Sequence, residues 1–281
     1  MRVQDLAQLS TRMFKTNPLR TWLTILGMGV GTGAVVVLVG LGFGLQKIIL
    51  EQIVFGETLL SLGVSSTGAQ NLKLDTATVE RFENMPEVQD AAPLARYPAL
   101  VTYKGLTGNV FIQGVQPAYL RYAGVAIEAG ETFTDEDIDD STSVLISPAA
   151  LQLFGVDDPA EFVGEEVSFR LLVPADDGSG ETTEIVLEDA YTVRGITREE
   201  GVLNAFMMIS ELRNYVGIDE FERVQVRVDS NENLPIVEER LIEEGFRVTA
   251  LSKTVDQASA IFQGVQVVLA AFGGIALIVS A

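Results

Sequence analysis

Side chains able to do chemistry are few in this chain, which has no histidine and no cysteine. The commonest general base, the commonest metal ligand and every thiolate are therefore missing. A serine nucleophile would have no imidazole to activate it, and no Ser–Lys motif stands out. Acids are plentiful, but at this density most of them form solvated surface. We expect no catalytic residue, no cofactor and no metal site, and we do not expect this chain to be an enzyme.

One acidic stretch, "DEDIDDS", invites comparison with a calcium-binding loop. Asp135, Asp137 and Asp139 match the alternating carboxylates at the start of such a loop. However, the sixth position is Asp140 where glycine makes the sharp turn, and the twelfth is Ile146 where glutamate binds calcium with both oxygens. We favour a solvated acidic loop over a calcium site, and we judge the "DDGSGE" turn a weaker candidate still.

A glycine-rich stretch, "LGMGVGTGAVVVLVGLGFGL", contains the pattern G-x-G-x-x-A at Gly29, Gly31 and Ala34. A dinucleotide-binding fingerprint needs a strand, a turn at the glycines, a helix and a later acid. Here the glycines lie inside an uncharged apolar run, and Glu51 follows no second strand pattern. A membrane-spanning helix needs about 20 apolar residues. The run therefore predicts a transmembrane helix over residues 19–46.

The glycines of this run form small-xxx-small pairs, which let two membrane helices approach closely. The pairs are Gly27 with Gly31, Gly29 with Gly33, and Gly40 with Gly44. We predict that these six glycines are helix-packing contacts, the alternative being the general enrichment of glycine in membrane helices.

The flanks of the run predict its orientation. Arg12, Lys15 and Arg20 precede it, so the positive-inside rule places the N-terminus in the cytoplasm of a cell-membrane protein, with residues 47–256 extracytoplasmic. Apolar and basic residues over 1–18 are spaced as in an amphipathic helix at the lipid interface, the alternative being a disordered tail. A second uncharged run over 257–281 predicts another transmembrane helix. We expect it to be truncated and the chain to be a fragment.

Strand and helix patterns alternate between the two apolar runs. A strand at "NLKL", a helix capped by Asp75 and a strand at "PLARYPALV" form one strand–helix–strand unit. "VQVRV", a helix closing at Gly245 and "FRVTAL" form another. We expect the two units to pair into a membrane-proximal α/β subdomain over 47–125 and 215–256. Residues 126–214 read as a β-rich insertion, in which Ser147 caps a short helix.

The predicted fold class is thus a membrane protein fragment, with two transmembrane helices flanking an α+β extracytoplasmic domain. The acids lie almost entirely in this domain and give the chain a net charge of −20. Because phosphates would be repelled, nucleic acid is excluded as a partner.

Four stretches in order resemble the N-terminal half of an FtsX-like/MacB-like ABC transporter permease. They are "NPLRTWLTILGMGVGTGAVVVLVGLGFG", "AIEAGETFTDEDIDDSTSVLISPAALQLFG", "YTVRGITREEGVLNAFMMI" and "IFQGVQVVLAAFGGIALIVSA". The resemblance implies four membrane helices, a large outer domain between the first two, and a partner ATPase whose movements are transmitted outward to export or extract a substrate. It also implies a permease homodimer or heterodimer.

No Walker A motif occurs in the sequence, so ATP would be bound by the partner. The alternative function is a membrane-bound sensor with an extracytoplasmic ligand-binding domain. A membrane-anchored hydrolase is disfavoured, because the chain has no suitable catalytic groups.

The glycine pairs generate a first test. We expect Gly31→Leu to weaken the association of permease helices, because the added side chain separates the two backbones. Val36→Leu, in the same run, is the matched control and should be tolerated. Energy transfer between labelled copies in membranes measures the association, and equal tolerance of the two substitutions would contradict the packing role.

Overall fold

The computed structural model of this chain divides into two compact units, residues 1–54 with 253–281 and residues 55–252. The residues that the structure describes are 18–19, 21–23, 25–30, 33, 36–37, 40, 44, 56–68, 72–137, 142–174, 182–198, 201–253, 261, 264, 267–268 and 271.

The described residues of the first unit are helical, and most of their apolar side chains are exposed, as Trp22 and Ile261 illustrate. No helix among the described residues combines the length and the apolar character that crossing a membrane requires. The interfacial helix expected over 1–18 lies almost wholly outside the described residues. Most of the run over 257–281 and much of that over 19–46 lie outside them too.

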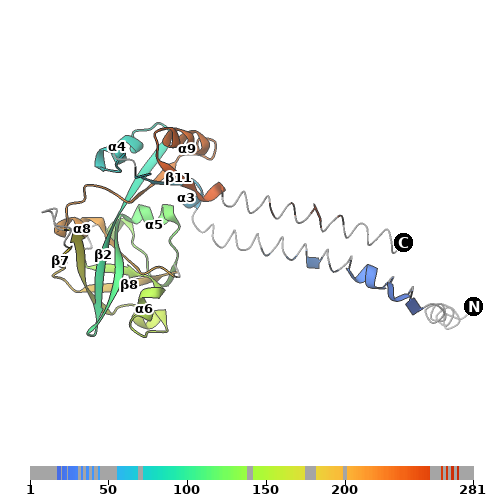
Figure 1. Ribbon diagram of the computed structural model, residues 1–281, viewed down its shortest axis with the longest axis horizontal. Coiled ribbons are helices and arrows are strands. Elements are labelled where there is room, and N and C mark those ends of the chain that lie inside the picture. The colour runs from blue at the N-terminus through green and yellow to red at the C-terminus, as the bar shows by residue number, and fades with distance from the viewer. Residues whose placement is uncertain are drawn as a thin grey trace, which may run out of the picture. The chain divides into compact units, whose positions relative to one another are not determined.

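The described residues of the second unit form eleven strands in one mixed sheet (Figure 1). The strands are β1 (Ser61–Ser65), β2 (Val88–Tyr103), β3 (Leu106–Val115), β4 (Ile127–Gly130), β5 (Ser143–Ile146), β6 (Glu166–Pro174), β7 (Thr182–Val186), β8 (Tyr191–Thr197), β9 (Asn204–Met208), β10 (Arg223–Val228) and β11 (Arg247–Ala250). The helices are α3 (Gly56–Leu59), α4 (Thr76–Glu83), α5 (Pro117–Ala123), the short 3₁₀ helix η1 (Asp135–Asp137), α6 (Pro148–Gln152), α7 (Pro159–Phe162), α8 (Ile209–Tyr215) and α9 (Leu234–Glu243). The expected mixture of strands and helices is confirmed.

One part of the sheet interleaves the two strand–helix–strand units. Its order is β11-β1-β10-β2, and each neighbouring pair is antiparallel. β1 therefore runs parallel to β2, and β10 to β11, each pair being connected through a helix, α4 or α9. This is the arrangement of a split βαβ sheet.

One end of each connecting helix lies where the sequence indicates. The Asp75 carboxylate accepts a hydrogen bond of 2.8 Å from the Thr78 backbone N–H, so the predicted cap of α4 is confirmed. After α9 the chain turns at Gly245 with φ +96°, as expected for a glycine that closes a helix. Phe82 of α4 meets Phe246, which follows α9, edge to face at 5.3 Å, and buried residues of both helices belong to the main apolar core.

The expected strand at "NLKL" is wrong. Residues 72–75 form no strand, and the first strand is β1, ten positions earlier in the chain. β1 pairs on both edges, with β10 and β11, and most of its residues are buried. A strand covered on both faces lacks the alternation of apolar and polar residues that marks a half-buried strand.

The rest of the sheet closes on itself. The pairings run β2–β3–β9–β5–β8–β6 and return to β2, which makes a six-stranded ring. Residues of the main apolar core alternate along two of its strands, as Phe169 and Leu171 do on β6 and Val144 and Ile146 on β5. Both β6 and β9 lie within residues 126–214, the segment expected to be rich in strands.

β2 belongs to both parts of the sheet, and Figure 1 shows it running from the α4 end of the unit to the opposite end. Residues 88–94 pair with β10, whereas residues 99–102 pair with β6. Pro98 lies between these two stretches, where that edge of β2 has no partner strand, so a proline is tolerated there. The subdomain boundaries expected at 125/126 and 214/215 stay a proposal. β2 and β3 lie in the segment 47–125 expected to be membrane-proximal, and they also contribute to the ring.

A second apolar cluster lies on the other face of the split sheet. Ala92 and Leu94 of β2 belong to it together with Tyr119 and Leu120 of α5, whereas Ala91 belongs to the main core. Because successive residues of a strand point to opposite faces, α5 covers the face opposite α4. The sheet is therefore buried on both sides.

Ser147 lies at the N-cap position of α6, as expected, but its side chain does not cap the helix. Its hydroxyl instead accepts a hydrogen bond of 3.0 Å from the Asn204 backbone N–H, which ties the start of α6 to β9. The turn at "PADDGSGE" lies, from residue 175 onwards, outside the described residues.

The backbones of β4 and β8 approach closely at two glycines. Gly130 has φ +78°, and a Cβ added to it would lie 2.3 Å from the Arg194 carbonyl oxygen. A Cβ at Gly195 would lie 2.6 Å from the Glu131 carbonyl oxygen. Neither backbone atom can move like a flexible side chain, so this pairing requires glycine at both positions.

We expect Gly130→Ala to lower the free energy of unfolding by at least about 2 kcal/mol, because a left-handed backbone and a backbone clash both oppose it. Gly155→Ala is the matched control, since its φ is +69° and its added Cβ meets no atom within 4 Å. Gly155→Ala should lower the free energy of unfolding by about 1 kcal/mol, because only the left-handed backbone opposes it. Urea unfolding of the whole chain measures both, and equal losses would contradict the close approach.

Candidate functional site

The dinucleotide-binding pattern does not form a phosphate-binding turn at its first glycine. Residues 25–30, which include Gly29, are helical, whereas the fingerprint needs a strand and a turn there. Gly31 and Ala34 lie outside the described residues. The helical backbone at Gly29 agrees with rejecting the nucleotide reading.

The helix-packing role of the glycines stays a prediction. At the five glycines of this set that the structure describes, an added Cβ would meet no atom within 4 Å; these are Gly27, Gly29, Gly33, Gly40 and Gly44. In the described part of the chain, their surface is open to a neighbouring helix.

The acidic stretch that resembled a calcium loop is held by arginines where the structure describes it. Arg121 of α5 lies 3.0 Å from the Asp135 carboxylate, and Arg194 of β8 lies 2.7 Å from that of Asp137. Within the described ranges, no group of three or more carboxylates is placed to hold a metal ion. Asp139 and Asp140 lie outside those ranges. The contacts seen support the reading without calcium.

Asp137 is the more firmly held of the two carboxylates. The Thr134 backbone N–H and hydroxyl donate to it at 2.8 and 2.6 Å. These bonds and the Arg194 guanidinium lower its pKa to about 2. Because the folded-state pKa is depressed, the stabilisation is present above the ordinary aspartate pKa and is lost only as the pH falls towards about 2.

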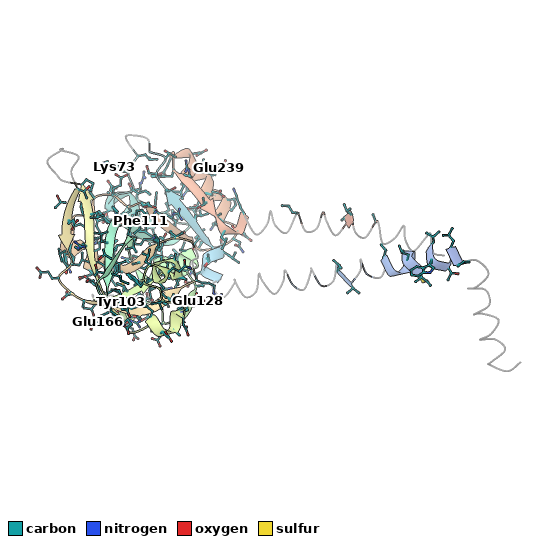
Figure 2. All side chains as sticks on the ribbon, turned by 60° about the horizontal axis from the view of Figure 1, so that its bottom comes forward. Lys73, Tyr103, Phe111, Glu128, Glu166 and Glu239 are labelled. Atoms are coloured by element: carbon teal, nitrogen blue, oxygen red, sulfur yellow. The ribbon has the colours of Figure 1, made fainter. Side chains whose placement is uncertain are left out.

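Three of the other acids lie apart from one another on the surface. Figure 2 shows Glu128, Glu166 and Glu239 on separate parts of the second unit, and all three are exposed. This distribution fits a solvated acidic surface.

A more specific arrangement surrounds α3, the first described element of the second unit. The Glu57 carboxylate bridges two arginines, with Arg227 of β10 at 2.5 Å and Arg121 of α5 at 3.3 Å. The neighbouring Thr58 is buried, and its hydroxyl donates to the Arg121 carbonyl oxygen at 2.9 Å. We call Glu57, Thr58, Arg121 and Arg227 the α3 clamp. It fixes α3 to two elements that are distant in sequence.

α5, which carries Arg121, is itself tied to the sheet. The Tyr122 hydroxyl donates to the Asp90 carboxylate of β2 at 2.6 Å. Burial and this bond raise the pKa of Tyr122 to about 12, so the phenol keeps its proton at any physiological pH. The α3 clamp therefore rests on a helix with a fixed position.

The ion pairs continue beyond the α3 clamp. Arg121 holds both Glu57 and Asp135, and η1, which carries Asp135, also carries Asp137, the partner of Arg194. A row of charged contacts thus leads from α3 through α5 and η1 to β8 of the ring. These side chains are partly exposed, so each pair alone stabilises little; their value is that they connect separate elements.

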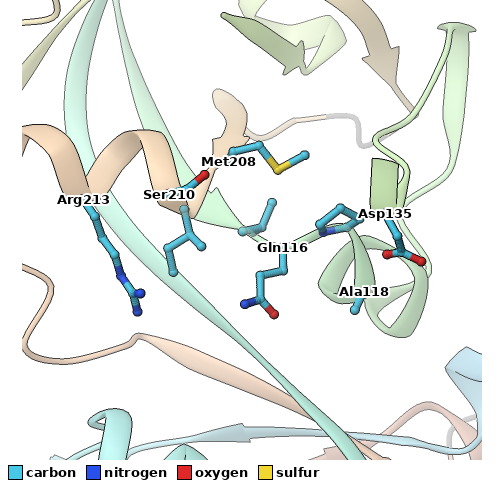
Figure 3. A pocket seen from close by; sticks show the side chains of 9 residues that line it. Gln116, Ala118, Asp135, Met208, Ser210 and Arg213 are labelled. Atoms are coloured by element: carbon cyan, nitrogen blue, oxygen red, sulfur yellow. The ribbon is translucent and has the colours of Figure 1, made fainter. Parts of the chain in front are cut away.

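A pocket of about 230 Å³ opens where β3 and β9 end (Figure 3). The two strands are parallel neighbours, and their last paired residues are Val115 and Met208. Each strand leads directly into a helix, α5 or α8. Ligands of α/β proteins are commonly bound outside the carboxyl ends of parallel strands.

The pocket combines apolar and charged walls. Its apolar lining comes from Val115, Pro117, Ala118, Met208 and Ile209, and its polar lining from Gln116, Asp135, Ser210 and Arg213. Figure 3 shows the Arg213 and Asp135 side chains on opposite sides, with Gln116 between them. Arg213 forms no ion pair within the described part of the chain, whereas Asp135 is already paired with Arg121.

Sequence reasoning missed both the α3 clamp and the pocket. Glu57 and Arg121 are 64 positions apart, and nothing local relates them. Arg213 reads as an ordinary cation in the last turn of a helix, where it complements the helix dipole. Only the pairing of β3 with β9 brings the pocket residues together.

The family model and the curated proteins that match this chain carry the same family name. The family model described as "MacB-like periplasmic core domain" matches residues 21–244. The "Macrolide export ATP-binding/permease protein MacB" of Neisseria gonorrhoeae is 26% identical over 171 residues, which is 58% of this chain and 26% of that protein. The protein of the same name from Chlorobaculum tepidum is 28% identical over 175 residues, 56% of this chain and 26% of its own. The chain spans about a quarter of the length of the curated relatives it matches.

The fold is also that of a solved structure, the periplasmic region of MacB from Actinobacillus actinomycetemcomitans. The two align with a TM-score of 0.50 and 15% identity, over 73% of this chain and 94% of the other. The family match covers most of the sequence, and the chain therefore belongs to the MacB-like periplasmic core domain family.

Proposed function

We propose that this chain is a permease subunit of an ABC transporter. It couples ATP hydrolysis by a partner ATPase to movement of its extracytoplasmic domain, and so exports or extracts a substrate. Family membership supports the permease role, and the relatives carry "ATP-binding/permease" in their names. Since this sequence has no Walker A motif, ATP is bound by the partner ATPase.

The observation that carries the coupling role is the attachment of the second unit's two ends. The chain enters this unit at α3 and leaves it after β11, and β11 pairs with β1, the strand that follows α3. Leu62 and Ala250 are direct partners in that pairing. A displacement of either end therefore acts on the same edge of the sheet. The α3 clamp passes it to α5 and β10.

The first unit is the proposed membrane part, with the N-terminus cytoplasmic and residues 47–256 outside. Its described apolar side chains are exposed in the single chain, and Leu19, Leu23 and Val267 are each more than 60% exposed. Apolar surface of this kind marks an interaction site. This apolar surface is covered by membrane lipid and by the helices of a second permease subunit, in a homodimer or heterodimer.

Purification of the full-length protein from its own cells under mild detergent tests the proposal. We expect an ABC ATPase to co-purify, with ATP hydrolysis in the complex. If no ATPase is recovered and a ligand-dependent kinase activity is found instead, the chain is a sensor and the proposal fails.

The α3 clamp provides a test of the coupling. We expect Glu57→Gln to leave ATP hydrolysis by the complex nearly unchanged but to reduce the nucleotide-dependent movement of the outer domain. The substitution keeps the shape of the side chain and removes the charge that both arginines bind. Because the chain has no cysteine, a single nitroxide at Leu106→Cys reports the movement as a spectral difference between the ATP and ADP states.

Glu184→Gln is the matched control. Glu184 pairs with Arg170 at 3.1 Å across β6 and β7, neither of which pairs with β1, β10 or β11, so its loss should leave the nucleotide-dependent movement intact. Equal movement in both variants, with hydrolysis intact, would refute the role of the α3 clamp while leaving the permease assignment standing.

A further inference from the structure

The pocket at the ends of β3 and β9 has the features of a small binding site that the proposed coupling does not use. Its base is rigid, because Val115 and Met208 are buried residues at the end of a continuous strand pair. Pro117 restrains the backbone of one wall at the start of α5. A ligand would meet a largely preformed surface, which lowers the entropy cost of binding.

The size of the pocket limits the ligand. A volume of about 230 Å³ is below the range of about 300–1,000 Å³ that is typical of sites for drug-sized molecules. It suits one or two apolar side chains.

The charges of the pocket define the polar end of the ligand. Arg213 is exposed, and no carboxylate of the described residues competes with an anion for its five N–H donors. Asp135 on the opposite side is neutralised in part by Arg121 at 3.0 Å. An anion would therefore bind at the Arg213 side, where a planar guanidinium can hold a carboxylate through two hydrogen bonds.

The groups between these charges fit a peptide. The Gln116 amide can both donate to and accept from a peptide bond, and the Asp135 carboxylate can accept from a backbone N–H. A carboxylate, an adjacent apolar side chain and a preceding peptide group occur together at the C-terminus of a polypeptide. Capture of a chain-terminal carboxylate is a known mode of peptide recognition.

We propose that this pocket binds the C-terminal carboxylate of a peptide or protein with an apolar last residue. Arg213 binds the carboxylate, and the apolar part of the pocket at the partly exposed Ala118, backed by the buried Val115 and Met208, receives the last side chain. A free short-chain acid shares this chemistry in part, but it lacks the peptide group that Gln116 and Asp135 can bind.

The test uses the whole chain in nanodiscs and a fluorescein-labelled hexapeptide of sequence SGSGVL. Fluorescence anisotropy compares its free carboxylate with its C-terminal amide. We expect the carboxylate form to bind about tenfold tighter or more, the ratio typical of hydrogen bonds to a charged group. This preference opposes the net charge of −20, which by itself would favour the less negative amide.

Arg213→Gln should remove the preference, whereas Arg247→Gln should keep it. Arg247 is exposed on β11 and does not line the pocket, so the control makes the same change in net charge. Ala118→Phe should weaken the binding of both peptides by filling the pocket. Equal binding of carboxylate and amide, or a preference that survives Arg213→Gln, would overturn the proposal.

Competition distinguishes the two sources of a carboxylate. Hexanoate should displace the peptide only at concentrations at least tenfold higher than the unlabelled peptide requires. Displacement at equal concentrations would show that the peptide group contributes nothing, and would overturn the assignment to a polypeptide terminus. The measurement needs no ATPase, so its result is separate from that of the proposed function.

Discussion

One strand with three neighbours determines the architecture of the second unit. β2 pairs with β3 along its second half, with β10 at its start and with β6 near its end. A strand has only two edges, so β10 and β6 must use the same edge in succession. The split sheet and the closed ring are consequently one hydrogen-bonded body. Neither part can shift along β2 without breaking backbone hydrogen bonds.

The charged side chains of the described residues serve mainly to hold elements of the fold together. In a domain with a large excess of acids, arginines are scarce, and several of them connect different elements: Arg227 and Arg121 hold α3, and Arg194 holds η1 to β8. Arginine suits this use because its planar group can serve two carboxylates at once, as Arg121 does. Such contacts order the elements of the fold, and they need no catalytic group.

The sequence predicted the parts of the fold that depend on local signals. Asp75 and Gly245 mark helix ends through caps and backbone conformation, and β6 alternates apolar and polar residues. The family relationship was likewise visible in the order of the stretches. β1 was missed because burial on both faces removes the periodicity on which the prediction depended.

The ring and the candidate site could not be predicted in this way. Closure of the ring requires β2 to meet β6, which begins more than 60 positions after β2 ends, and sequence pattern does not encode such a pairing. The α3 clamp and the pocket depend on the same long-range pairings. Their residues are ordinary surface acids and arginines until the sheet brings them together.

The position of the two chain ends on the sheet has a geometric consequence. The ends of the second unit lie on adjacent strands, β1 and β11, at one border of the sheet, whereas the β2–β3 hairpin lies at the far end of a strand of 16 residues. Such a strand is about 50 Å long at about 3.3 Å per residue. A domain held along one border can rotate about that border, and the parts farthest from it then move most. A rotation of a few degrees at that border would then move the hairpin by several ångströms, so a small motion near the attachment becomes a large one at the distal tip.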